Sequence, residues 1–257
     1  MCAGCKSQSL DARSRFVEDG VSIEAHDQWS GERVDIDNAG VTPTGGLAIT
    51  TDDGRTRVLA VARLLVNGDT TDKPTADNAI VAAAATYTLT TTYTLTTTFS
   101  DPKVTSVRCG QVNSAAGDPA GCDALDVTLP AGKEEQPLSV TARSGNGRVG
   151  VSLGGELRAL DLRGSRGPIE VSVPATKGAT ITIVADTGDD IVLRLPRGFG
   201  ADVVTLDTGG AIDTAAFPGL QSGRGRGVAG LGAKSITVRS SATGNVGGRI
   251  VLLAQDM

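Results

Sequence analysis

Acidic and amide side chains gather in three short segments, and these are the groups of the chain best suited to hold a cation. The segments are Thr51–Gly54, Asn67–Asp72 and Gly188–Asp190. Calcium takes about 6–8 oxygen ligands, several of them carboxylates of one loop. Asp and Asn also dominate ordinary turns, because their side chains accept hydrogen bonds from nearby backbone N–H groups. We therefore interpret all three segments as turns and predict no metal site and no cofactor.

Carboxylates can also catalyse hydrolysis or elimination in carbohydrates. Asp186, Asp189 and Asp190 are close in sequence and resemble the acid cluster of a polysaccharide hydrolase or lyase. His26 is the only histidine, so a catalytic triad, a Cys-His pair or a histidine zinc site would depend on it alone. It lies in the alternating stretch VSIEAHDQW, which is typical of a solvated strand. We predict that the protein is not an enzyme; a carbohydrate-active or carbohydrate-binding solenoid protein is the alternative.

The N-terminal cysteines bear on localisation. Ala3-Gly4-Cys5, followed by a polar stretch, resembles the end of a bacterial lipoprotein signal peptide, in which the cysteine receives the lipid. The position three before Cys5 is Cys2 rather than the usual leucine, and the basic and apolar regions expected upstream are not present. We predict lipidation of Cys5, a membrane contact through that lipid and a place in the bacterial cell envelope. The alternative is a cytosolic N-terminus with two unpaired cysteines.

Two further cysteines indicate an oxidising compartment. Cys109 and Cys122 bracket a loop rich in Gly, Asn, Asp and Pro between two β-patterned runs. A disulfide closing a loop of this length would stabilise the fold by roughly 3 kcal/mol in the chain-entropy model. Two thiolates without a further Cys or His do not complete a tetrahedral metal site. We predict a disulfide, which agrees with an exported protein.

The overall composition excludes some partners. The 257 residues include 34 glycines and 3% aromatic residues, and the net charge is −5, with a pI near 5.0. A nucleic-acid-binding surface needs clustered cations, and the GRGRG run at Gly223–Gly227 is better interpreted as an exposed turn. No run approaches the ~18 apolar residues of a membrane-spanning helix.

A repeat of 22 residues predicts the architecture. Residues 169–188 align with residues 191–210, and Val171/Leu193, Val173/Leu195 and Ile181/Val203 coincide. Units of similar length reach back to residue 125, each with two short alternating strands and a turn, and residues 233–253 supply two more strands. Such units suit the coils of a β-solenoid, whose stacking ~4.8 Å apart makes a continuous Val, Ile and Leu core. An antiparallel β-sandwich is the alternative.

The same units carry a family resemblance. SGNGRVGVSL, DTGDDIVLRLPRGFGADVVTLDTGGAID and SITVRSSATGNVGGRIVL resemble the bacterial β-solenoid domains known as "putative adhesin", many of which belong to secreted proteins or lipoproteins. The resemblance covers roughly residues 120–255. Its motifs are glycine turns and strand alternation, so it implies a fold and carries no catalytic residues.

The N-terminal third is predicted to be β-rich with one short helix. The Asp52-Asp53-Gly54 segment predicts a hairpin turn, and residues 75–85 predict a helix with Thr75 as its N-cap. Residues 86–100 (TYTLTTTYTLTTTFS) follow as a strand with one all-hydroxyl face. One uninterrupted strand of this length would span about 50 Å, so we predict a bend or an edge position. Trp29, Tyr87 and Tyr93 could form a sugar platform but are interpreted as packing residues.

These observations predict three regions: a tail (1–20), a β-rich part (21–124) and a repeat-built solenoid (125–257). The predicted function is a non-enzymatic envelope lipoprotein with a structural or adhesin-like surface role. The sequence does not identify a ligand and leaves a surface polysaccharide and a surface protein open; nucleic acid is not expected. A cytosolic scaffold or filament-like solenoid is a further alternative.

Overall fold

The computed structural model describes an all-β molecule. It describes residues 21–28, 33–38, 46–66, 87–94, 104–111, 120–145, 147–164, 166–220, 232–241 and 247–255. None of these residues is helical. The helix predicted over residues 75–85 lies outside the described residues.

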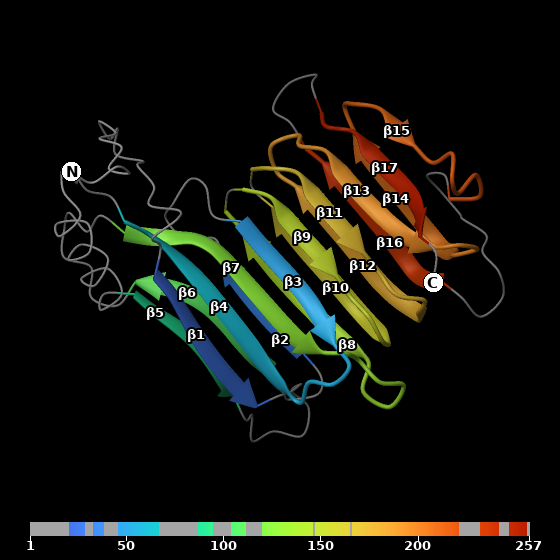
Figure 1. The fold of residues 1–257 in the computed structure, drawn as a ribbon. Coiled ribbons are helices and arrows are strands. Elements are labelled where there is room, and N and C mark those ends of the chain that lie inside the picture. Colours follow the sequence, from blue (N-terminus) through green and yellow to red (C-terminus); the bar gives the residue numbers. More distant parts are fainter. Residues whose placement is uncertain are drawn as a thin grey trace, which may run out of the picture.

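The described strands form two sheets (Figure 1). The nine-stranded sheet contains, in spatial order, β1 (Val21–Gln28), β4 (Arg57–Val66), β7 (Ala120–Pro130), β3 (Gly46–Asp52), β9 (Val149–Ser152), β11 (Ile169–Ser172), β13 (Ile191–Pro196), β17 (Ile250–Gln255) and β15 (Ile212–Asp213). The eight-stranded sheet contains β14 (Ala201–Thr208), β16 (Gly232–Ser240), β12 (Lys177–Ala185), β10 (Leu157–Gly164), β8 (Leu138–Ser144), β2 (Arg33–Asn38), β6 (Val104–Gln111) and β5 (Tyr87–Thr94).

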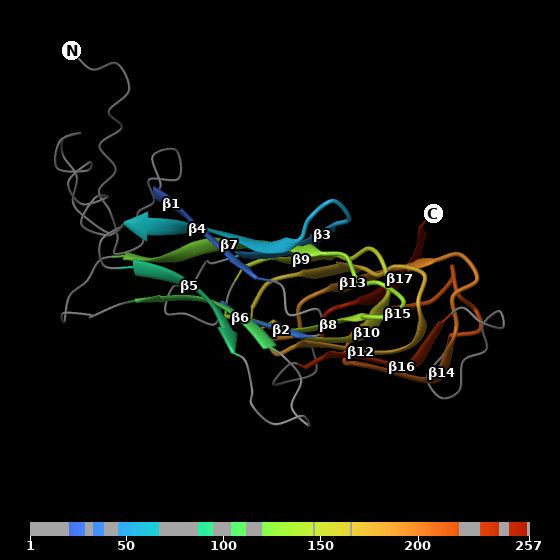
Figure 2. The same ribbon diagram turned by 90° about the horizontal axis from the view of Figure 1, so that it is seen from below.

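Most neighbouring strands run parallel, and the two sheets lie face to face (Figure 2). Among the described strands, antiparallel pairing is confined to one end, where β4 pairs with β1 and β7, and β5 pairs with β6. This pairing differs from the antiparallel sandwich considered as an alternative. Parallel neighbours arise because the chain crosses from one sheet to the other after each strand from β8 to β15, so each return to a sheet runs in the same direction.

One strand of each sheet, such as β8 with β9, forms one layer of the stack. The register shows that these layers differ in the number of residues they contain. Val171 lies beside Leu193, as the 22-residue repeat predicts. On the other side of β11, however, Ile169 lies beside Val149, twenty residues earlier in the chain. Both β12 and the corner after it are longer than β10 and the corner after β10, so a single repeat length cannot hold throughout.

Two strand pairs are inserted between layers that are consecutive in sequence. β2 and β3 lie between the β6–β7 layer and the β8–β9 layer, and β16 and β17 lie between the β12–β13 layer and the β14–β15 layer (Figure 1). The predicted match of Ile181 with Val203 is therefore wrong. Ile181 lies beside Ile236 of β16, whose other neighbour is Val204.

The core fills the space between the sheets. Inward residues alternate with outward residues along most of the described strands, as period-two burial requires, and most of the buried residues are Val, Ile or Leu, with some Ala. Leu162 and Ile183 are adjacent in this row and completely buried. Each such side chain contributes ~1.5–3 kcal/mol on burial. Among the described side chains, one continuous apolar core extends from Val107 of β6 to Leu206 of β14.

The N-terminal third contains a turn and an edge strand at positions predicted from the sequence. Asp52-Asp53-Gly54 forms a turn, but it does not close a hairpin, because β7 lies between β3 and β4 and pairs with both. The threonine-rich strand is described over Tyr87–Thr94, at the edge of the eight-stranded sheet, which agrees with the predicted edge position. The boundary predicted between residues 124 and 125 falls inside β7. β2 lies in the same sheet as β8, and β3 lies in the same sheet as β9.

Candidate functional site

The acidic segment Gly188–Asp190 makes structural contacts at the corner between β12 and β13. The Asp189 carboxylate accepts hydrogen bonds from the Gly167 backbone N–H (2.8 Å) and the Thr187 hydroxyl (2.7 Å). Gly167 belongs to the preceding corner, so this carboxylate ties two successive layers together. The contacts agree with the interpretation of this segment as a turn.

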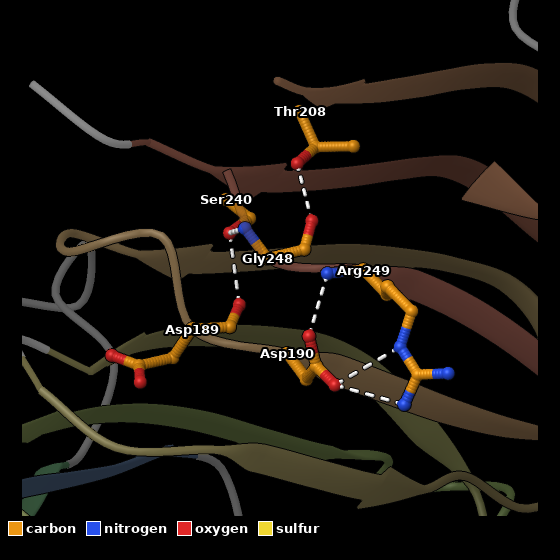
Figure 3. Close-up of polar contacts among 6 residues, drawn as sticks. All are labelled: Asp189, Asp190, Thr208, Ser240, Gly248 and Arg249. Carbon is orange, nitrogen blue, oxygen red and sulfur yellow. Dashed lines mark hydrogen bonds and ion pairs between the residues drawn. The ribbon is translucent and has the colours of Figure 1, made fainter. Parts of the chain in front are cut away.

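Asp190 contacts the inserted β17 layer instead (Figure 3). Its Oδ1 accepts a hydrogen bond from the Arg249 backbone N–H at 2.7 Å, and its Oδ2 lies 3.2 Å from Nε and 3.0 Å from Nη2 of Arg249. The backbone hydrogen bond, aided by the guanidinium, holds the pKa of Asp190 below its ordinary value. Both side chains are substantially exposed, so the Coulomb attraction is screened by water.

Hydroxyl groups complete this corner. The Ser240 hydroxyl donates to the Asp189 carbonyl at 2.8 Å and accepts from the Gly248 N–H at 3.2 Å. The Thr208 hydroxyl donates to the Gly248 carbonyl at 2.5 Å (Figure 3). These contacts hold the inserted layer to the layers on both sides.

Among the described residues no group of three or more His, Cys, Asp or Glu side chains is arranged to hold a metal ion.

The first acidic segment also makes local turn contacts. Asp52 Oδ1 accepts a hydrogen bond from the Gly54 N–H at 2.9 Å, which is the behaviour expected of an aspartate in a turn. Thr51 accepts from the Gly154 N–H at 2.6 Å, so this segment is tied to the corner after β9.

Several predicted positions cannot be assigned contacts. Cys5, Trp29, Asn67–Asp72 and Gly223–Gly227 lie outside the described residues. The backbones of His26, Tyr87, Tyr93, Cys109 and Cys122 lie in strands, but their side chains are outside the described part. Cys109 is on β6 and Cys122 on β7, in different sheets, and their disulfide stays a prediction.

The outer face of the eight-stranded sheet presents two parallel rows of polar side chains. The rows cross the strands, because residues in register on neighbouring strands point to the same side. The arginine row consists, from β2 to β14, of Asp37, Arg143, Arg163, Val184, Arg239 and Asp207. The threonine row lies two residues earlier on each strand and consists of Asp35, Thr141, Asp161, Thr182, Thr237 and Thr205.

The charges in the arginine row are unevenly compensated. Arg239 lies 3.9 Å from Asp207. Arg143 and Arg163 are direct neighbours across β8 and β10, both are exposed, and neither guanidinium has a hydrogen bond or ion pair within the described part of the chain. Neighbouring strands lie about 4.8 Å apart, so two positive charges face solvent side by side.

The sequence interpretation missed this pair for a specific reason. A constant repeat of 22 residues places Arg143 opposite Ser165, whereas the observed offset of twenty residues places it opposite Arg163. The recurring Gly147 and Gly167, both in the left-handed region with φ of 88° and 113°, are the signal that could have revealed the shorter offset.

The molecule is similar in fold to a solved structure. No family model and no curated protein match the sequence. The crystal structure of a putative cell adhesion protein from Clostridium sporogenes aligns with a TM-score of 0.56, covering 92% of this chain and 100% of that chain, at 8% identity. At that identity the likeness shows the fold alone. In the described part, no helix is long and apolar enough to span a membrane.

Proposed function

We propose that this protein is a non-enzymatic, lipid-anchored protein of the bacterial cell envelope with a structural or adhesin-like surface role. The observation that carries the proposal is the fold, shared over 92% of the chain with a protein described as a putative cell adhesion protein. The long stack of strands supports it physically, because the outer face of the eight-stranded sheet carries rows of polar side chains that run across the strands and could meet an extended partner.

The proposal treats each pair of facing strands as one coil of a β-solenoid. Regular alternation between the two sheets from β8 to β15 supports this description. In this description the pairs β2–β3 and β16–β17 are coils that lie out of sequence order within the stack. A stack of this kind is stiff, because each layer is hydrogen-bonded to both neighbours, and stiffness suits a protein that projects a binding face from a membrane.

Lipidation of Cys5 would supply the anchor. Mass spectrometry of the N-terminal peptide from the native host should show an acyl modification on Cys5, with the protein in the membrane fraction. A Cys5→Ser variant should leave that fraction. A cytosolic protein with an unmodified Cys5 would remove the anchor from the proposal. Peptide mapping without reductant of the same sample tests the predicted Cys109–Cys122 bridge.

The adhesive role is tested by deleting the gene in the host and measuring attachment to a surface or to other cells. Complementation with the wild-type gene should restore attachment, and complementation with Cys5→Ser should not, because the protein would be released. If the deletion strain attaches as well as the parent, the adhesive role is wrong.

A further inference from the structure

The charge arrangement on the eight-stranded sheet points to a class of ligand. Like charges that lie directly opposite each other on neighbouring strands destabilise a sheet. Arg143 and Arg163 are such a pair, and no described carboxylate is bonded to either of them. An anionic group bound between them would relieve the repulsion and could accept hydrogen bonds from both guanidinium groups in the two-point geometry that arginine favours.

Hydroxyl groups lie alongside this pair. Thr141 is two residues before Arg143 on the same face of β8, and Thr182, Thr237 and Thr205 extend the row across β12, β16 and β14. A hydroxyl both donates and accepts hydrogen bonds, which suits the hydroxyls of a sugar. Asp161 interrupts the row between Thr141 and Thr182, and its carboxylate is an acceptor for sugar hydroxyls.

The two rows run across the strands, so a matching ligand is a linear polymer lying along the stack. Adjacent layers repeat every ~4.8 Å, which presents equivalent groups at regular intervals. No described side chain of this face is aromatic, so recognition would use hydrogen bonds and ion pairs rather than ring stacking.

The mixture of positive and negative side chains on this face favours an acidic polysaccharide over a nucleic acid as the polyanion bound. The described side chains of the two rows and the adjoining Arg33 include four arginines and four aspartates: Arg33, Arg143, Arg163, Arg239, Asp35, Asp37, Asp161 and Asp207. A nucleic acid, with one charge per ~1.7 Å of duplex, needs a denser field of cations. A polysaccharide with separated acid groups and many hydroxyls fits this mixed face better.

We propose that the outer face of the eight-stranded sheet binds a linear acidic polysaccharide, with Arg143 and Arg163 holding its carboxylate or sulfate groups and the threonine row its hydroxyls. This inference rests on the proposed surface role, because such a polymer would be the material to which the protein attaches.

The test measures binding of the folded full chain to immobilised polygalacturonate, which carries carboxylates, and dextran sulfate, which carries sulfates, with uncharged dextran as reference. Double-stranded DNA serves as a competing polyanion. The variants are Arg163→Gln and Arg143→Gln/Arg163→Gln. The matched control is Arg194→Gln, because Arg194 is exposed on β13 in the other sheet and has no described ion pair.

Wild type should bind at least one acidic probe and not dextran. The double variant should bind about tenfold more weakly, Arg163→Gln should show part of that loss, and Arg194→Gln should be unchanged. Binding should weaken as salt increases. Absence of binding to both acidic polymers, equal losses in Arg163→Gln and Arg194→Gln, or tighter binding to DNA would overturn the inference. Attachment of host cells that survives Arg143→Gln/Arg163→Gln would contradict this ligand while leaving the surface role intact.

Discussion

Asp190 and Arg249 are 59 residues apart in the chain and form a contact with three bonds between the corner before β13 and the residue before β17. The backbone N–H and the guanidinium of Arg249 both donate to the one carboxylate. Because β17 is inserted between β13 and β15, this contact joins the inserted layer to a layer formed much earlier in the sequence.

Replacing Asp190 with alanine should lower the free energy of unfolding by about 1 kcal/mol, because exposed ion pairs are weak and the freed N–H can bind water. Urea unfolding at neutral pH measures this change. Asp207→Ala is the control, since Asp207 lies 3.9 Å from Arg239 with both side chains exposed, and it should change stability by less than about 0.5 kcal/mol. Equal losses in both variants would contradict a special role for Asp190.

The contribution of Asp190 should depend on pH in a defined direction. Its folded-state pKa lies below the ordinary value of 3.8, so the charged carboxylate stabilises the fold above that value and the stabilisation is lost as the pH falls through the folded-state pKa. The stability difference between wild type and Asp190→Asn should therefore be constant from about pH 5 to 7 and shrink below ~pH 4. A difference that grows on acidification would contradict the assignment.

Gly167 should tolerate no side chain. Its φ is 113°, and a Cβ there would overlap the carbonyl of Gly147 in the neighbouring corner. We expect Gly167→Ala to cost about 1–3 kcal/mol. Gly150→Ala on β9 is the matched control, because a Cβ at Gly150 meets nothing within 4 Å, and its effect should stay within about 0.5 kcal/mol. Thermal unfolding of the two variants gives the comparison.

Removal of the inserted C-terminal layer should damage the middle of the stack rather than its end. Without residues 232–257, β12 and β14 lose the strand between them, as do β13 and β15. Unpaired strand edges promote association, so the truncated chain should aggregate or lose hydrogen-exchange protection in β12 and β13. A soluble truncated monomer with protection equal to that of the full chain would contradict the inserted position of β16 and β17.

Local features of this fold could be predicted from the sequence, and long-range ones could not. Period-two alternation indicates which side of a strand is buried, and the 22-residue repeat correctly placed Val171 beside Leu193. Alternation by itself does not indicate which strand becomes the neighbour, because β14 and β16 have the same apolar alternation and either could pair with β12. The insertion of β16 is a pairing between segments far apart in the sequence, and a local pattern contains no information about such pairing.

The same limit applies to the candidate binding face. Thr180 and Thr182 on β12 are recognisable as outward positions from alternation alone. The Arg143–Arg163 pair depends on the number of residues in the whole turn of chain from β8 to β10, which a uniform 22-residue repeat misjudges by two residues. An error of two keeps every residue on its correct face, so the predicted core was unaffected while the predicted surface neighbours changed.

The most direct measurement of the proposed role uses inert beads coated with the folded protein, because it separates the protein from every other component of the cell. Beads coated through the N-terminal end should attach to cells or surface material of the native habitat several-fold more often than beads coated with heat-unfolded protein. Equal attachment of the two kinds of bead would contradict the adhesive role.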